Sequence, residues 1–428
     1  MLAVPTSYQY PQEQHYVWRE NTSSMEEAPK SSEMGDEDLL RILHKCRKKK
    51  DLGHAFRLHT HIHSKGLDTQ MSVGNHLVPL FVDCGGLAMA EQVFYKLIVR
   101  NEFSWTAMIQ GYVGCGDYQH ALDLFDMMQK ETSIFPTRHT FLAVLKACAR
   151  IKWLGKGREI HKVILNGKGL QFDPFVGNTL VDMYAKCGSL DEAREVFHKL
   201  PVRDVVSWNA LITGYADIGL DEETLLCLEG LKSDGLTPDC ITLVGSLKAC
   251  ANARSLHRGL KIHSEIVELG SEPDPVIGYS LVEMYAKCAS FIEARSVFDK
   301  LPSRDVVSWT VLMVGYTENN CGQEALECFD EMQQERVLPD DVAFVCSLKA
   351  CGIIGETRKG QELHVEIEGN GFLEKEVTAG NALVNMYCKH GLVEKAAKVF
   401  NRLSIRDVVS WTALIAGCVE HGDSMKAL

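Results

Sequence analysis

The sequence lacks the features that mark membrane proteins, metal centres and the common enzyme classes. It has no run of about 18 apolar residues, so no membrane-spanning helix or membrane insertion is expected. Its 15 cysteines include no Cys-x-x-Cys pair, and neither a glycine-rich phosphate loop nor a Gly-x-Ser-x-Gly elbow occurs. We therefore expect no metal, no cofactor and no catalytic centre.

Positive charge is also scarce. Lysine and arginine number 45 against 57 acidic residues, a net charge of −12, which argues against indiscriminate phosphate binding but permits a local basic groove. Residues 1–35 have no hydrophobic periodicity and are rich in Gln, Glu, Ser and Pro, so we expect a disordered tail. Because this tail is acidic, it shows no clear transit peptide.

What the sequence does contain is one string written three times. Arg-Asp-Val-Val-Ser-Trp spans 203–208, 304–309 and 406–411, and a degenerate copy ends at Trp105. The four tryptophans of these strings are 103, 101 and 102 residues apart, which indicates an array of repeats. The cysteines recur at fixed positions of this array, so we interpret them as small buried residues in a reducing compartment.

Each interval between the tryptophans divides into three pieces. The first follows the tryptophan, the second carries Lys-Ala-Cys and then a His, and the third carries Met-Tyr-Ala-Lys-Cys or a variant. In the third piece at 174–204, apolar residues spaced i, i+3, i+4 and i+7 from Leu180 share one helix face. Gly188 ends this helix, and Ser189 with Glu192 predicts a capping box that starts a second. Neither helix can bury its apolar face alone, so the hairpins must stack into an α-solenoid.

These strings resemble pentatricopeptide repeats of the plant PLS subfamily, in which standard, long and short repeats alternate, without a recognisable C-terminal E/DYW extension. The resemblance covers 36–428 and rests on Val-Val-Ser-Trp-Asn-Ala-Leu-Ile at 205–212, on Asn-x-Leu-Val-x-Met-Tyr-Ala-Lys-Cys at 178–187, and on the Ala-Cys and His of the long repeats. It implies an all-α, right-handed superhelical solenoid of about eleven complete hairpins and a partial twelfth. The repeats are expected at 36–70, 71–101, 102–137, 138–173, 174–204, 205–239, 240–274, 275–305, 306–340, 341–376, 377–407 and, in part, 408–428.

The resemblance also implies single-stranded RNA binding, one base per repeat, read by the fifth and the last residue of each repeat. An amide or hydroxyl at the fifth position can hydrogen-bond an unpaired base. The pairs expected to favour U are Asn178 with Asp204, Asn209 with Asp239, and Asn381 with Asp407. Asn75 with Asn101 should favour C over U, Thr310 with Asp340 should favour G, and Thr106 with Thr137 and Tyr279 with Asp305 should have weak or no preference. Thr412 is the fifth residue of the partial repeat.

Apolar residues occupy two further positions of interest. The fifth residue of the long repeats cannot read a base edge by hydrogen bond (Leu40, Leu142, Val244 and Val345), so the expected target is roughly 5′-YNNUUNNGNU-3′, where Y is a pyrimidine. The second residue of the reading repeats is expected to sandwich bases (Phe103, Phe175, Val206 and Val307). The four tryptophans are expected to pack between hairpins.

Two other patterns have a structural interpretation. The basic run at 45–50 fits a solvated helix end better than a phosphate clamp. His263 with Glu265, and His364 with Glu366, resemble the His-x-Glu of zinc deaminases, but no Pro-Cys-x-x-Cys completes such a site. Since a His occupies the 24th position of all four long repeats, we interpret it as part of the repeat.

We therefore expect a specificity factor that supports RNA editing, processing or stability in a mitochondrion or chloroplast, with a trans-acting editing or processing enzyme as partner. Two alternatives remain: a protein–protein scaffold, and the N-terminal part of a DYW-type editing deaminase whose catalytic domain lies beyond Leu428. The pairing of Asn or Thr with Asp at fixed offsets favours RNA over a scaffold.

Overall fold

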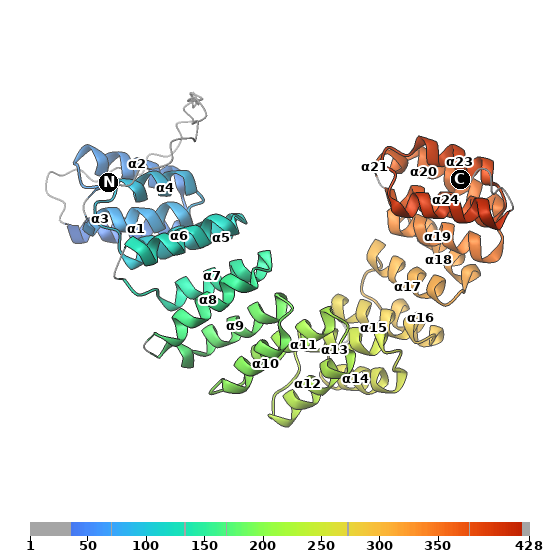
Figure 1. The fold of residues 1–428 in the computed structure, drawn as a ribbon, viewed down its shortest axis with the longest axis horizontal. Helices are drawn as coiled ribbons and strands as arrows, with labels where there is room; N and C mark the ends of the chain where they lie inside the picture. Colours follow the sequence, from blue (N-terminus) through green and yellow to red (C-terminus); the bar gives the residue numbers. More distant parts are fainter. Residues whose placement is uncertain are drawn as a thin grey trace. The chain divides into compact units, whose positions relative to one another are not determined.

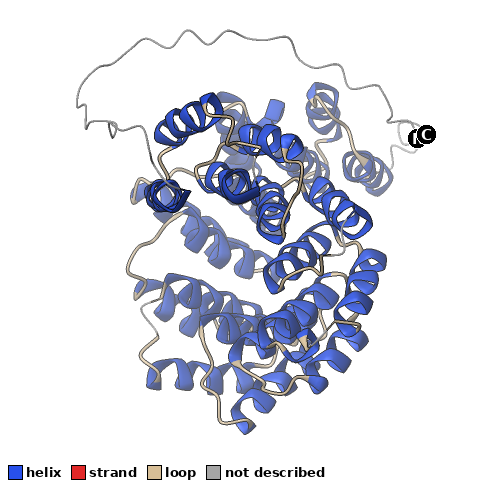
Figure 2. Ribbon diagram, turned by 90° about the vertical axis from the view of Figure 1, so that its left-hand side faces the viewer, coloured by secondary structure: helices blue, strands red, loops and turns tan. Residues whose placement is uncertain are grey.

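A computed structural model of the chain describes residues 36–69, 71–131, 134–167, 169–271, 274–375 and 377–421. The regular secondary structure in these ranges is helical throughout (Figure 2), as the hydrophobic periodicity predicted. The expected disordered tail, residues 1–35, lies outside the described residues. None of the described helices has the length and apolar content needed to cross a membrane.

The chain divides into two compact units, Met1–Arg100 and Asn101–Leu428. In the first unit, α1 (Asp36–Lys49) and α2 (Leu52–Ser64) form one hairpin, and α3 (Met71–Asp83) and α4 (Leu87–Lys96) form the next. Helix α1 packs against α3. The prediction of one uninterrupted solenoid over 36–428 did not include this division.

The second unit continues the series of helices. Their bounds are α5 (Glu102–Cys115), α6 (Tyr118–Glu131), α7 (Arg138–Ile151), α8 (Leu154–Leu165), η1 (Leu170–Phe172), α9 (Pro174–Lys186), α10 (Leu190–Lys199), α11 (Val205–Asp217), α12 (Asp221–Ser233), α13 (Cys240–Asn252), α14 (Leu256–Glu268), α15 (Pro275–Lys287), α16 (Phe291–Asp299), α17 (Val306–Glu318), α18 (Gly322–Gln334), α19 (Asp341–Ile354), α20 (Thr357–Gly369), α21 (Phe372–Lys375), α22 (Val377–Lys389), α23 (Val393–Arg402) and α24 (Val408–Glu420).

The first helices of successive hairpins form one continuous layer in this unit. Each packs on the next, from α5 on α7 through α9, α11, α13, α15, α17 and α19 to α22 and α24. The hairpins follow one another in chain order (Figure 1). This is the α-solenoid expected of helices that can bury their apolar faces only against neighbours.

Tryptophan and phenylalanine join neighbouring hairpins at equivalent places. The rings of Phe197 and Trp208 meet edge to face with centroids 4.5 Å apart, and those of Phe298 and Trp309 with centroids 4.6 Å apart. Trp105 and Trp309 are fully buried and Trp208 is 8% exposed, which confirms the expected core position of these three. Trp411 is the exception at 51% exposed.

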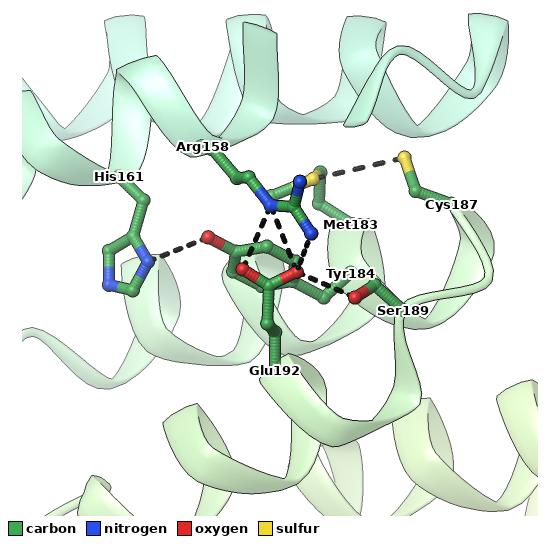
Figure 3. A network of polar contacts seen from close by, with 7 residues as sticks. All are labelled: Arg158, His161, Met183, Tyr184, Cys187, Ser189 and Glu192. Carbon is green, nitrogen blue, oxygen red and sulfur yellow. Dashed lines mark hydrogen bonds and ion pairs between the residues drawn. The ribbon is translucent and has the colours of Figure 1, made fainter. Parts of the chain in front are cut away.

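A polar network joins α8 to the start of α10 in the hairpin at 174–204 (Figure 3). Arg158 of α8 donates to both carboxylate oxygens of Glu192 at 2.7 to 3.1 Å, and the Ser189 hydroxyl donates to Glu192 Oε2 at 2.6 Å. The predicted capping box is wrong in one respect: Ser189 is the N-cap of α10, but its side chain makes no cap bond to the helix backbone. Its hydroxyl binds the glutamate instead, and Ser290 binds Glu293 in the same way at 2.8 Å one period later.

The histidine of each of three long repeats binds a tyrosine of the short repeat that follows. His161 Nδ1 lies 2.9 Å from the Tyr184 hydroxyl (Figure 3). The equivalent distances are 2.6 Å from His263 to Tyr285 and 2.9 Å from His364 to Tyr387. Burial raises the pKa of Tyr184 and Tyr285 to about 12 and lowers the pKa of His161. The structural interpretation of the His-x-Glu strings is therefore confirmed.

Candidate functional site

The structure brings the three expected U-reading pairs into hydrogen-bond contact. Each asparagine is the fifth residue of a first helix, and its partner aspartate begins the first helix of the next hairpin. Asn178 Nδ2 donates to the two Asp204 oxygens at 2.9 and 3.0 Å, Asn209 Nδ2 donates to both Asp239 oxygens at 2.9 Å, and Asn381 Nδ2 donates to Asp407 Oδ1 at 3.1 Å. A carboxylate accepts only, so each amide is held with its nitrogen toward the aspartate.

Two further pairs of the second unit behave differently from each other. The Tyr279 hydroxyl donates to Asp305 Oδ2 at 3.0 Å, so a tyrosine takes the place of the asparagine. Thr310 Oγ1 donates instead to the carbonyl of Val307 in its own helix at 2.9 Å. The Thr310 hydroxyl is therefore satisfied within its own helix, and the choice of G by Thr310 with Asp340 stays a prediction.

The remaining candidate fifth residues bind hydroxyl or backbone partners. Thr106 Oγ1 lies 3.5 Å from Thr137 Oγ1 and 2.8 Å from Thr140 Oγ1. Asn75, in the first unit, donates to the Val99 carbonyl at 3.0 Å. The other fifth residue, Thr412, donates to the carbonyl four residues before it at 2.7 Å.

The last residue of a repeat also caps the next helix, a role that the sequence reasoning missed. Asp239 Oδ1 accepts the Thr242 backbone N–H at 2.9 Å at the start of α13. Asn101 likewise accepts two backbone N–H groups at the start of α5. The residues in this N-cap role are Asn101, Thr137, Asp173, Asp204, Asp239, Asp274, Asp305, Asp340 and Asp407. The known N-cap preference for Asp, Asn and Thr would have revealed it.

In the long repeats the capping residue has no polar fifth residue as a partner. Asp173 and Asp274 cap α9 and α15, although the fifth residues of their repeats are the half-buried Leu142 and Val244. An aspartate at the end of a repeat therefore does not by itself indicate a reading pair. A hydrogen bond from the fifth residue distinguishes the three expected U-reading pairs from these caps.

Both the cap and the amide favour the ionised form of Asp239 and Asp407. Burial raises the pKa of Asp239, but the Thr242 N–H and the Asn209 amide outweigh it, and the pKa lies below its ordinary value. For Asp407 the Ser410 N–H is the main cause of a lowered pKa. These carboxylates are therefore acceptors at neutral pH.

The reading amides are covered, whereas the apolar residues beside them are exposed. Asn178 and Asn209 are 7% exposed and Asn381 is 9% exposed, so only a small part of each amide faces outward. Three positions earlier on the same helix face, Phe175 and Val206 are 62% and 61% exposed. Such exposed apolar side chains occupy the second position of most first helices: Phe103, Phe175, Val206, Ile241, Val276, Val307, Val342 and Val409.

Exposed lysines recur on the same layer of first helices. Lys146, Lys248 and Lys349 are exposed at the ninth position of three long repeats, and Lys248 Nζ lies 3.1 Å from Asp217. The predicted basic run is an exposed end of α1, where Arg47 pairs with Asp83. No cluster of three or more metal-ligating side chains occurs within the described ranges.

Comparison with known proteins identifies the repeat. Residues 100–150 and 304–352 match the family described as PPR repeat family. Residues 178–205, 206–236, 381–408 and 409–428 match the family described as PPR repeat.

The relatives are plant proteins longer than this chain. A chloroplastic pentatricopeptide repeat-containing protein of Arabidopsis thaliana is 33% identical over 358 residues, which is 84% of this chain and 41% of the relative. A mitochondrial one is 34% identical over 364 residues, 85% of this chain and 35% of the relative. The chain thus spans less than two thirds of the length of these relatives.

The fold is similar to that of a solved plant solenoid. The crystal structure of the pentatricopeptide repeat protein PPR10 from maize superposes with a TM-score of 0.61 at 17% identity, over 91% of this chain and 62% of that one. The predicted α-solenoid of helical hairpins is therefore confirmed.

Proposed function

Because this chain is built from pentatricopeptide repeats, we propose that it binds single-stranded RNA sequence-specifically, with one base per repeat. Maize PPR10, which shares the fold, has been solved in complex with an 18-nt psaJ RNA element, with a TM-score of 0.56 to this chain. The proposed target is roughly 5′-YNNUUNNGNU-3′. We also propose that the chain belongs to the PLS subfamily, in which standard, long and short repeats alternate.

The observation that carries this proposal is the hydrogen bond between the fifth residue and the last residue of the same repeat. In Asn178, Asn209 and Asn381 the amide nitrogen is held by a carboxylate. A held amide offers a donor and an acceptor in fixed directions, which is what selecting the edge of an unpaired base requires. A protein scaffold has no use for such an amide at the same place in successive hairpins.

The surroundings of the amides suit a nucleotide. The exposed Phe175 and Val206 offer surface on which a base can stack beside its reader. Exposed lysines such as Lys146 and Lys349 can neutralise phosphates locally, although the whole chain carries a net charge of −12. The steep salt dependence typical of phosphate-driven binding should therefore be modest here.

In the cell, the proposed role is that of an organellar specificity factor for RNA editing, processing or stability. Relatives named chloroplastic and mitochondrial support an organelle as the location. The factor would recruit a trans-acting enzyme, because the described residues hold no catalytic constellation. Since the chain spans only part of its relatives, an attached deaminase domain is the second candidate for that enzyme.

The experiment that tests the proposal is a binding assay with the RNA above. We expect replacement of the fourth, fifth and tenth bases by A to weaken binding by more than about tenfold, because three amide contacts are lost. Equal affinity for both RNAs, or no affinity for either, would overturn the proposal in favour of a scaffold.

A further inference from the structure

A buried hydroxyl of the following repeat contacts several of the proposed base-reading pairs. We propose that this residue, third in the repeat after the reader, is a positioning residue that sets base selectivity by holding the oxygen of the reader's side chain while the carboxylate holds its nitrogen. This inference rests on the proposed RNA binding. It adds a third member to a site defined so far by the fifth and the last residue.

The site of Asn209 shows the arrangement most fully. Thr242 Oγ1 lies 2.6 Å from Asn209 Oδ1, to which it donates, and 2.9 Å from Asp239 Oδ1. Thr242 is fully buried. The amide nitrogen is thus fixed by Asp239 and the amide oxygen by Thr242, so the amide can neither flip nor turn.

The same arrangement recurs in two other repeats. Ser410, also fully buried, donates to Asn381 Oδ1 at 2.5 Å and lies 2.8 Å from Asp407 Oδ1. Thr140 Oγ1 lies 2.8 Å from Thr106 Oγ1. The contact therefore does not depend on whether the hydroxyl residue is Ser or Thr, or on whether the reader is Asn or Thr.

Where the hydroxyl is missing or turned away, the reader is held less completely. Ala343 stands at the third position after Thr310, and Thr310 bonds its own helix. Ser207 stands after Asn178, but its hydroxyl donates to the Asp204 backbone carbonyl at 2.8 Å. Asn178 Oδ1 is then buried with no hydrogen-bond partner among the described residues.

The contact positions the amide without using up its capacity to bind a base. An amide oxygen has two lone pairs and an amide nitrogen has two hydrogens. Thr242 engages one lone pair of the amide oxygen, and Asp239 holds the amide nitrogen, so Asn209 keeps one acceptor for the base. Selectivity rises because a wrong base cannot be met by reorienting the amide.

The test uses the full chain and single-base variants of the target RNA. Thr242→Val removes the hydroxyl at nearly constant shape, and Ser410→Ala removes the other. We expect Thr242→Val to lower the preference for U over C at the fifth base by about 3-fold to 10-fold, the value of one hydrogen bond. The preference at the tenth base stays unchanged. Ser410→Ala should lower the preference at the tenth base and leave the fifth base unchanged. Thr242→Ser keeps the hydroxyl and should keep the parent's selectivity.

A matched control separates positioning from stability. Ser246 lies one turn later on α13, is fully buried and donates to the Thr242 carbonyl at 2.8 Å, so Ser246→Ala removes a buried hydroxyl that does not touch a reader. We expect it to leave the fifth-base preference intact. Equal losses at both bases in Thr242→Val, or the parent's preference in both hydroxyl variants, would overturn the inference.

Asn209→Ala distinguishes this failure from failure of the proposed function. If Asn209→Ala abolishes selection at the fifth base while Thr242→Val does not alter it, only the positioning role is wrong. If neither Asn209→Ala nor the RNA sequence affects binding, the proposed function and this inference are both wrong.

Discussion

At the scale of single residues, one carboxylate caps a helix and also belongs to a proposed base-reading pair. Asp239 caps α13 and holds the Asn209 amide. Asp274 caps α15 in the same way, but the fifth residue of its repeat is Val244. The two aspartates therefore form a natural pair for separating the two roles.

Replacing each of these aspartates by alanine should remove one N-cap and change binding in only one of the two variants. We expect the lost cap to lower the free energy of unfolding by about 0.5–2 kcal/mol in both Asp239→Ala and Asp274→Ala, and Asp239→Ala to cost about 1 kcal/mol more because the Asn209 amide also loses its acceptor. Only Asp239→Ala should weaken the choice of U at the fifth base. Denaturant unfolding and binding to single-base RNA variants measure the two effects, and a loss of selectivity in Asp274→Ala would refute the assignment.

At the scale of elements, the junction between a long and a short repeat contains a buried histidine. His161 and His364 bind Tyr184 and Tyr387, and burial is the main cause that lowers the pKa of both histidines below 6.5. The unfolded chain therefore takes up protons at a higher pH than the folded chain. Stability contributed by the neutral histidines is complete above pH 6.5 and declines as the pH falls below it.

We accordingly expect the thermal midpoint to be lower at pH 5.5 than at pH 7.5. The double variant His161→Gln with His364→Gln should show a smaller drop, because glutamine can keep a hydrogen bond to tyrosine and does not titrate. His139→Gln, at an exposed position of α7, is the matched control and should keep the parent's drop. An undiminished drop in the double variant would contradict this explanation.

The packing of tryptophan between hairpins gives the largest stability effect. Trp309 is fully buried against the Phe298 ring, so Trp309→Ala should cost about 3–5 kcal/mol. Trp153 is 42% exposed, and Trp153→Ala should cost clearly less. Denaturant unfolding of the two variants measures the difference, and equal losses would show that this contact does not join the hairpins.

At the scale of the whole molecule, the hairpins were predictable because each depends on residues close in the sequence. The apolar spacing around Leu180 and the break at Gly188 predict α9 and α10 within one repeat. The pairing of Asn209 with Asp239 followed from the repeat period, once the family resemblance had named the positions. The contact of a third residue with this pair, the hydrogen bond from the Thr242 hydroxyl to Asn209, could not be predicted from the sequence.

The hydrogen-bond partners of Ser189 and Thr310 also became clear only from the structure. Ser189 has the sequence of a capping residue, yet Glu192 also accepts Arg158 from another hairpin and takes the serine hydroxyl. Thr310 has the position of a reader but satisfies its hydroxyl within its own helix. In each case the side chain has more than one possible partner, and the sequence pattern does not say which one it binds.

The central claim is that successive repeats read successive bases through their fifth and last residues, and one measurement tests it most directly. Thr310→Asn gives the repeat at 306–340 the Asn and Asp pair of the repeats that should choose U, and asparagine is long enough to reach Asp340. With four RNAs that differ only at the eighth base, we expect the preference to move from G to U by about tenfold, near 1.4 kcal/mol. An unchanged preference at that base, or a change at another base, would contradict the claim.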